Sequence, residues 1–184
     1  MRLVLLGGPG AGKGTQGKRL STKLQIPLIS TGEVLRNAIA LASELGQQAR
    51  SFVEKGELVP DELMIQFMRD RLSQTDTASG WLLEGYPRTA FQAEELDFLL
   101  DELQQSLNGA IYLEVPEAIM QQRSASRGLP DDRPEIVHRR IELFCDRTLP
   151  ILEYYDKRDR LLKIDGNLTP DQVHRDILRE LNLP

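Results

Sequence analysis

Several residue types are scarce in this 184-residue chain, and their scarcity excludes some classes of protein. The only cysteine is Cys145, which rules out an internal disulfide and a cysteine-based zinc site. Aromatic residues make up 5% of the chain, so the core must be mostly aliphatic. No apolar run approaches the length of a membrane span. The short run Met1–Leu6 stops at glycines and does not continue as a signal peptide. We therefore expect a cytoplasmic protein with no membrane segment.

Positive charge is also in short supply, because 23 Lys and Arg residues stand against 28 Asp and Glu residues, for a net charge of −5. Binding of nucleic acid ordinarily needs a basic surface that neutralises phosphates, so we expect no nucleic-acid partner. An anionic substrate would need a local basic cluster instead. Both histidines, His138 and His174, fall on predicted outer helices, and neither is a candidate general base.

The chain alternates short aliphatic runs with amphipathic stretches, and it contains no repeat, low-complexity tract or linker. The aliphatic runs predict strands at residues 2–6, 27–29, 81–84, 110–114 and 161–164. Helices are predicted at residues 12–24, 45–55, 61–72, 89–100 and 116–127, at 134–158 with a kink at Pro150, and after Thr169. Ser30 and Glu33 have the spacing of a capping box and should open a further helix, and Thr169 and Gln172 have the same spacing.

This alternation predicts one α/β domain over residues 1–184, with a five-stranded parallel sheet covered by helices on both faces. Ligands on such sheets bind beyond the carboxyl ends of the strands. Residues that follow the five strands should therefore share one cleft.

The first of these strand ends is Gly7–Thr15, which fits the pattern G-x-x-x-x-G-K between a strand and a helix. Its glycines allow backbone N–H groups to turn toward phosphate oxygens, and the following helix directs its N-terminus at the same anion. Lys13 adds a mobile positive charge. Gly14 stands where most such loops carry Ser or Thr for magnesium, and Thr15 is the candidate substitute. The loop predicts a bound nucleoside triphosphate.

Five segments together narrow the function: residues 7–16, 30–36 (STGEVLR) and 85–89 (GYPRT), the pair Asp131-Asp132, and the pair Asp165-Gly166. On these segments the chain resembles the adenylate kinases over essentially its whole length. The resemblance implies a P-loop NTPase fold with a helical NMP-binding insertion at residues 30–59 and a short lid at about 127–133. It also implies a monomer that uses Mg²⁺, without zinc, to transfer a phosphoryl group reversibly from ATP to AMP, giving two ADP.

The resemblance also implies roles for individual residues. Expected ATP contacts are Gly10, Ala11, Gly12, Lys13, Gly14, Thr15, Arg123, Arg127 and Leu168. Expected AMP contacts are Thr31, Arg36, Glu57, Leu58, Val59, Gly85, Tyr86, Pro87, Arg88, Gln92 and Arg140. The expected catalytic residues are Lys13, Arg88, Arg123 and Arg140. Glu84 occupies the position at which the family usually has an Asp that orients magnesium-bound water.

The residues themselves agree with these roles. A planar guanidinium binds phosphate through paired hydrogen bonds, which suits Arg36 and Arg88 at predicted cleft positions. The Gln92 amide has the donor and acceptor that an adenine edge requires. Arg123 and Arg127 lie four apart, on one helix face. Together with Arg133, Arg139 and Arg140 they form the required basic cluster; the alternative is a solvated helix face balanced by nearby carboxylates. For Glu84 the alternative is a strand-end carboxylate that pairs with Lys13.

One position departs from the family pattern. Leu129 stands where a lid arginine is expected, and we hypothesise that Arg133 partly replaces that arginine.

Two other functions stay open at this point: a UMP/CMP kinase of the same family, and a P-loop regulatory protein that binds nucleotide without catalysis. A P-loop GTPase would need an Asn-Lys-x-Asp segment, which the chain lacks.

Overall fold

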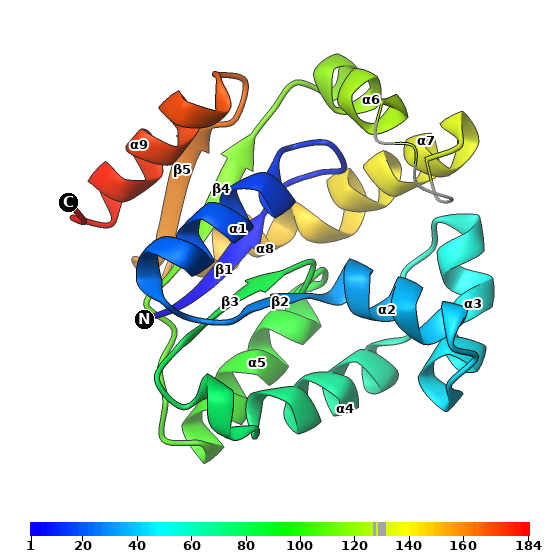
Figure 1. Ribbon diagram of the computed structural model, residues 1–184, viewed down its shortest axis with the longest axis horizontal. Helices are drawn as coiled ribbons and strands as arrows, with labels where there is room; N and C mark the ends of the chain where they lie inside the picture. Colours follow the sequence, from blue (N-terminus) through cyan, green and yellow to red (C-terminus); the bar gives the residue numbers. More distant parts are fainter. Residues whose placement is uncertain (127, 129–131) are drawn as a thin grey trace.

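The computed structural model describes residues 1–126, 128 and 132–184. Within these residues, parallel strands form one sheet in the order β2-β3-β1-β4-β5 (Figure 1). The strands are β1 (Arg2–Leu6), β2 (Leu28–Ser30), β3 (Trp81–Glu84), β4 (Gly109–Glu114) and β5 (Leu161–Asp165). The predicted parallel sheet is confirmed, and each strand begins and ends within one residue of its prediction.

Helices cover both faces of this sheet. On one side lie α1 (Lys13–Leu24), α6 (Glu117–Ala125) and α9 (Pro170–Glu180); on the other lie α4 (Asp61–Leu72), α5 (Ala90–Glu102) and α8 (Pro150–Asp156). Successive residues of β1 alternate between two hydrophobic clusters, with Leu3 and Leu5 on the α1 side and Val4 and Leu6 on the α5 side. Because both faces are buried, the strands are apolar throughout instead of alternating with polar residues.

Two predicted capping boxes have opposite outcomes. Thr169 accepts a hydrogen bond from the N–H of Gln172, and the Gln172 side chain returns to Thr169, so this box is confirmed. At Ser30 the predicted helix start is confirmed, since Ser30 is the N-cap residue of α2 (Thr31–Ala40), but the predicted capping box is wrong, because the Ser30 side chain makes no capping hydrogen bond. Parallel pairing places Ser30 opposite Glu84, and the Ser30 hydroxyl donates to that carboxylate. The hydroxyl is therefore directed at the carboxylate on the neighbouring strand and not at the backbone N–H groups in the first turn of α2.

The long helix predicted at residues 134–158 is interrupted. It begins as α7 (Pro134–Leu143), widens into the π-helical turn η2 (Phe144–Thr148) and continues as α8. The N–H of Leu149 donates to the carbonyl of Phe144 at 2.9 Å, which is the wider spacing of a π-turn. Pro150 follows at once and has no N–H to donate, so the ladder is already disrupted there. The predicted irregularity therefore precedes Pro150 rather than lying at it.

Between β2 and β3 the chain leaves the sheet to form α2 and α3 (Glu44–Lys55), and α4 and the 3₁₀ turn η1 (Thr75–Thr77) return it. Figure 1 shows α2 and α3 beside one another at the right, with α3 near α7. The predicted insertion at residues 30–59 corresponds to α2, α3 and the loop after them. Most of the predicted lid, residues 127 and 129–131, lies outside the described residues. Within the described part of the chain, no helix is both long and apolar enough to cross a membrane.

Candidate nucleotide-binding site

The glycine-rich loop connects β1 to α1 through backbone conformations that favour glycine. Gly10 and Gly12 have φ angles of 74° and 94°, in the left-handed region. A Cβ atom at Gly10 would also lie 2.6 Å from the carbonyl oxygen of Met120. The ammonium of Lys13 lies across the loop and donates to the carbonyls of Gly7 and Gly8, at 2.8 Å each. A positive charge is therefore held at the N-terminus of α1, where an anion is favoured.

A cavity opens over this loop at the carboxyl end of the sheet. It is lined by residues 10–16, Ser30, Glu33, Arg36, Glu84, Arg123, Gly166, Leu168, Pro170 and Val173. The cavity brings together the residues predicted to contact ATP, apart from Arg127, which lies outside the described residues. It also contains Glu84 and residues at or after the ends of β1, β2 and β5, so the predicted convergence is confirmed for four strands, whereas no residue directly after β4 is among those that line it.

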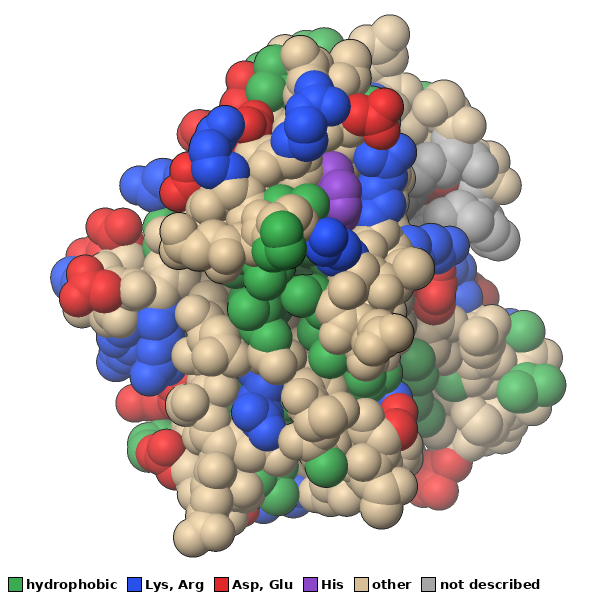
Figure 2. All heavy atoms as spheres, turned by 60° about the vertical axis from the view of Figure 1, so that its left-hand side comes forward, with side chains coloured by type: hydrophobic (Ala, Val, Ile, Leu, Met, Phe, Trp, Pro, Cys, Tyr) green, Lys and Arg blue, Asp and Glu red, His purple; other side chains and the backbone are tan. Residues whose placement is uncertain are grey.

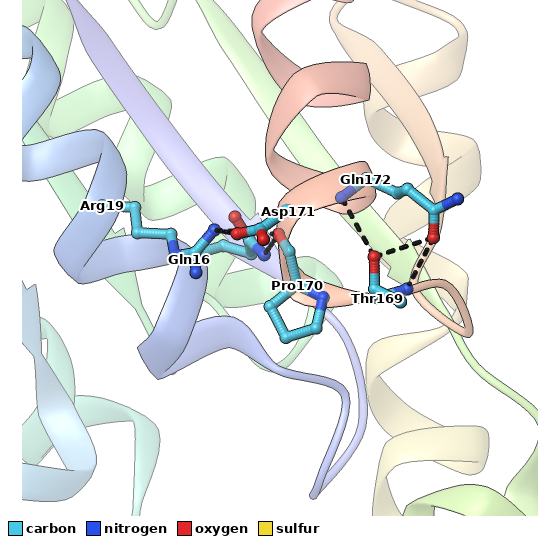
Figure 3. A network of polar contacts seen from close by, with 6 residues as sticks. All are labelled: Gln16, Arg19, Thr169, Pro170, Asp171 and Gln172. Carbon is cyan, nitrogen blue, oxygen red and sulfur yellow. Dashed lines mark hydrogen bonds and ion pairs between the residues drawn. The ribbon is translucent and has the colours of Figure 1, made fainter.

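The start of α9, which lines one side of this cavity, is held against α1 by polar contacts (Figure 3). Gln16 and Arg19 both donate to the Pro170 carbonyl, at 2.8 and 3.2 Å, and Arg19 also pairs with Asp171 at 2.7 Å. That pairing lowers the pKa of the Asp171 carboxyl. From the other side, Arg123 donates to the Gly166 carbonyl at 2.9 Å. The segment that carries Leu168 is thus held at both ends. Sequence reasoning missed Gln16 and Arg19, although they lie three apart on one helix face.

Glu84 is held where β2 and β3 end side by side. Ser30 donates its hydroxyl to Glu84 Oε2, and Thr31 donates to the Glu84 backbone carbonyl at 3.3 Å. Ser30 is buried, while the Glu84 side chain is only partly buried and lines the cavity. The described residues contain no group of three or more His, Cys, Asp or Glu side chains that could hold a metal ion. Glu84 shares this cavity with Glu33, and the Glu84 carboxylate is oriented by a neighbouring hydroxyl.

A second cavity lies beside the first, between the α2–α3 insertion and the sheet. It is lined by Thr31, Gly32, Leu35, Arg36, Val53, Gly56, Glu57, Leu58, Val59, Met64, Gly85, Arg88, Gln92 and Arg140. Most of the residues predicted to contact AMP lie on this wall. Tyr86 lies beneath it, buried, with its hydroxyl donating to the Gln92 backbone carbonyl at 3.2 Å. Burial and the nearby carboxylates Glu95 and Asp61 raise the pKa of Tyr86.

The turn after β3 places Arg88 at the edge of this second cavity. Gly85 has a φ of 88°, and a Cβ atom there would lie 2.4 Å from the Thr31 hydroxyl. Arg88 donates through Nε to the Gly85 carbonyl at 2.8 Å, and its own carbonyl accepts from Thr148 at 2.9 Å. The guanidinium is thus oriented by the backbone of its own turn.

Gln92 is buried against this turn, with 2% of its surface exposed. Its Oε1 accepts the backbone N–H of Arg88 at 2.8 Å, and its Nε2 donates to Asp61 Oδ1 at 2.7 Å. Sequence reasoning missed Asp61, because α4 meets α5 only in the tertiary structure.

The two cavities meet across a third space lined by residues from both. Pro9 and Lys13 reach it from the loop, Pro87 and Arg88 from the turn, and Arg140 from α7. Arg88 and Arg140 line the second cavity as well, and Arg36 is shared by the first and second cavities. The buried carboxylate of Asp132 lies near Arg140, with 4.0 Å between Asp132 Oδ1 and Arg140 Nη1. Cationic groups are therefore concentrated between the two cavities.

The rest of the predicted basic cluster contacts the α2–α3 insertion. Arg139 forms a paired interaction with Glu57, at 2.8 and 3.1 Å, and this lowers the pKa of the Glu57 carboxyl. Arg133 is 64% exposed and donates to the Glu54 carbonyl at 3.5 Å. Leu129, the position at which the family has the lid arginine that Arg133 would partly replace, lies outside the described residues. Both arginines thus connect α7 to the insertion. His138 and His174 lie away from the cavities, as expected.

A glycine-rich loop at the carboxyl end of a parallel sheet, with a second cavity across a cationic space, defines a P-loop protein with two adjoining cavities. Comparison with known proteins identifies the family. The adenylate kinase family model matches residues 5–160. "Adenylate kinase 2" of Nostoc sp. is 62% identical over 181 residues, which cover 98% of each chain. "Adenylate kinase 2" of Synechocystis sp. is 53% identical, over 98% of this chain and all of the relative. "Adenylate kinase" of Thermosynechococcus vestitus is 42% identical. The chain belongs to the adenylate kinase family.

Proposed function

We propose that the chain catalyses ATP + AMP ⇌ 2 ADP, with the triphosphate in the P-loop cavity and the monophosphate in the cavity beneath the α2–α3 insertion. The observation that carries this proposal is the shared space between the cavities. It is lined by Lys13 from one side and by Arg88 and Arg140 from the other. A phosphoryl group passing between the two ligands would cross this space, surrounded by positive charge. The likeness to adenylate kinases supports the same reaction.

The reaction needs no general base, because the accepting phosphate oxygen already carries negative charge. Catalysis then depends on in-line positioning and on cations that neutralise the charge of the transferred group. Lys13 and Arg123 would hold the donor, Arg36 and Arg88 the acceptor, and Arg140 the group in transfer. Arg127 is assigned to the donor by resemblance alone. Residues 30–59 and the lid at residues 127–133 would close over the ligands and exclude water that would otherwise hydrolyse the triphosphate.

Adenylate kinases generally use Mg²⁺, and the donor set near the loop fits this ion. Mg²⁺ commonly binds through one or two carboxylates, phosphate oxygens and water, without an all-protein cage. Glu84 supplies one such carboxylate, with one oxygen held by Ser30. We assign Glu84 to a water-mediated contact with Mg²⁺, with Thr15 as a further polar group at the same cavity, and we assign no zinc. When bound, Mg²⁺ would neutralise charge on the terminal phosphates.

A kinase for UMP or CMP is the second candidate within this family. Thr31 and Gln92 line the proposed base pocket and favour adenine. A regulatory protein that binds nucleotide without turnover rests only on the substitution at Leu129.

A coupled assay of ATP with each of the four monophosphates separates these functions. AMP should be the preferred acceptor, and Lys13→Ala should abolish turnover while the protein remains folded by circular dichroism. Equal or better turnover of CMP would replace the AMP assignment, and no turnover of any monophosphate would favour the regulatory function.

The proposal includes a monomeric, cytoplasmic enzyme without nucleic-acid or membrane partners. Strand β1, the apolar run at the start of the chain, is buried in the centre of the sheet, which supports a structural role for that run. Figure 2 shows basic and acidic side chains interspersed over the face that it presents. Size-exclusion chromatography with light scattering measures the oligomeric state, and a dimer mass would overturn the monomer assignment.

A further inference from the structure

We propose that Asp61 is a positioning residue that fixes the orientation of the Gln92 amide and thereby sets the preference of the pocket for adenine over 6-oxopurines. This inference rests on the proposed function, in which the cavity lined by Gln92 receives the base of the monophosphate. It concerns one hydrogen bond, from Gln92 Nε2 to Asp61 Oδ1 at 2.7 Å.

The Gln92 amide is fixed by two partners that cannot exchange roles. An ionised Asp side chain only accepts hydrogen bonds, and a backbone N–H only donates. The Asp61 carboxylate therefore requires the NH₂ end of the amide, while the Arg88 N–H, 2.8 Å from Oε1, requires the carbonyl end. A flipped amide would place an oxygen against the carboxylate and an NH₂ group against the N–H. Both contacts would be repulsive, and because Gln92 is buried, water could not relieve them.

After these two bonds, the amide retains one hydrogen and one lone pair. Since Gln92 lines the second cavity, these are the groups that it can offer to a base. Adenine presents an acceptor at N1 and a donor at its 6-amino group, which match the fixed amide. Hypoxanthine and guanine present a donor at N1–H and an acceptor at O6, the opposite pattern. A base of the second kind needs the flipped amide, which Asp61 and Arg88 oppose together.

The backbone of Gln92 is held independently of Asp61. Its N–H donates to the Thr89 hydroxyl at 3.1 Å, and its carbonyl accepts from the Tyr86 hydroxyl at 3.2 Å. Asp61 itself lies at the first position of α4, on a separate element. Removal of the Asp61 carboxylate should therefore release only the amide torsion of Gln92. Without Asp61, only the Arg88 N–H opposes the flip.

The test compares kcat/KM for AMP and for IMP in Asp61→Ala, Asp61→Asn and a matched control, Glu62→Gln. Glu62 is the adjacent exposed carboxylate in the first turn of α4, so its removal has the same effect on the helix terminus. We expect the AMP-to-IMP ratio to fall about tenfold or more in Asp61→Ala, because hydrogen-bonding sites discriminate strongly against mismatched groups. The ratio should also fall in Asp61→Asn, because an Asn amide can donate to a flipped Gln92 as readily as it accepts from an unflipped one and so no longer fixes its orientation. The ratio should be unchanged in Glu62→Gln.

The readout is a ratio, so a general loss of stability would not change it, and KM for ATP should stay constant in every variant. An unchanged AMP-to-IMP ratio in Asp61→Ala would overturn the inference. Gln92→Leu separates this failure from failure of the proposed site. If Gln92→Leu raises KM for AMP while Asp61→Ala retains selectivity, only the role of Asp61 is wrong. If Gln92→Leu leaves KM for AMP unchanged, the proposed AMP pocket is wrong. If Asp61→Ala does not fold, the nearly isosteric Asp61→Asn carries the same test, and an unchanged ratio there would overturn the inference.

Discussion

The two cavities of this enzyme are built in different ways. The P-loop cavity centres on consecutive residues, Gly7–Thr15, whose backbone conformation and helix N-terminus favour a bound anion. The second cavity, beneath the α2–α3 insertion, has no such local element. Its wall combines side chains from α2, the loop after α3, the turn after β3, α5 and α7. A short continuous segment therefore determines the first cavity, whereas the packing of several elements determines the second.

This difference predicts where single substitutions have the largest effects. A cavity built mainly from backbone groups depends on few side chains, so the loss of one of them should reduce activity strongly. A cavity built from many side chains distributes binding over all of them, so the loss of one should reduce activity only in part. Five experiments test this contrast, from the largest expected effect to the smallest.

Lys13→Ala removes the one mobile cation of the loop. We expect kcat to fall by at least about 10³-fold, since preorganised charge at a reacting group typically contributes that much. Lys23→Ala, at an exposed position of the same helix, is the control and should retain full activity. A loss in kcat below about tenfold for Lys13→Ala would show that the P-loop cavity, like the second one, spreads its function over many groups.

Arg88→Lys keeps the charge and removes the planar fork. We expect kcat/KM for AMP to fall by about 10²-fold, because an ammonium cannot bind phosphate through paired hydrogen bonds. The bond from Nε to the Gly85 carbonyl is lost as well. Arg50→Lys, an exposed arginine of the insertion, is the matched control. Equal kinetics of Arg88→Lys and the wild type would contradict a role in phosphate binding.

Ser30→Ala leaves Glu84 without its hydroxyl partner. We expect the Mg²⁺ concentration at half-maximal activity to rise about tenfold, the value of one charge-assisted hydrogen bond. Titration of Mn²⁺ with bound nucleotide, followed by electron paramagnetic resonance, should show the same weakening.

Glu84→Asp completes this test as a double-mutant cycle. The shorter carboxylate should lose contact with Ser30, so Ser30→Ala should change little in the Glu84→Asp background. Additive effects of the two substitutions would indicate that Ser30 acts independently of Glu84.

Arg133→Ala examines the hypothesis about Leu129. If Arg133 partly replaces the missing lid arginine, kcat should fall about fivefold, as expected for one partly solvated charged contact. Leu129→Arg should then raise kcat in the Arg133→Ala background. Unchanged turnover in Arg133→Ala would reject the replacement and leave Arg133 as a contact to Glu54.

Arg139→Ala should have the smallest effect, less than about threefold on kcat/KM for AMP, because exposed ion pairs contribute little. The effect of this substitution on the stability of the fold should depend on pH. Arg139 lowers the pKa of Glu57, so the pair stabilises the fold above the ordinary pKa of a Glu. This contribution is lost as the pH falls through the lowered pKa. Thermal unfolding should thus separate wild type and variant near neutral pH, and the two should converge in acid. A difference that persists in acid would exclude the ion pair as its cause.

The contrast between the cavities also explains which sequence predictions succeeded. The glycine loop and the capping box at Thr169 are confirmed, because each depends on residues close in the sequence. The parallel sheet is confirmed as well, because alternating strands and helices with apolar strands favour that arrangement. The capping box at Ser30 is wrong for a tertiary reason: the pairing of β2 with β3 brings Glu84 beside it. The π-turn before Pro150 was foreseen only as a kink.

The roles of Gln16, Arg19 and Asp61 were not predicted, since each depends on a contact between elements distant in the sequence. The proposed roles of individual site residues stay predictions until the substitutions are measured.

By itself, the sequence determined the succession of strands and helices along the chain, the phosphate loop and the resemblance to adenylate kinases. These follow from apolar periodicity and from continuous motifs, whose geometry is local. Only the tertiary structure decided that Ser30 orients Glu84, that α9 is held to α1, and that Asp61 and Arg88 hold the Gln92 amide from opposite ends. Hydrogen bonds between distant elements depend on atomic distances that packing alone sets. The arrangement of side chains in the second cavity is therefore a property of the fold and not of any one segment.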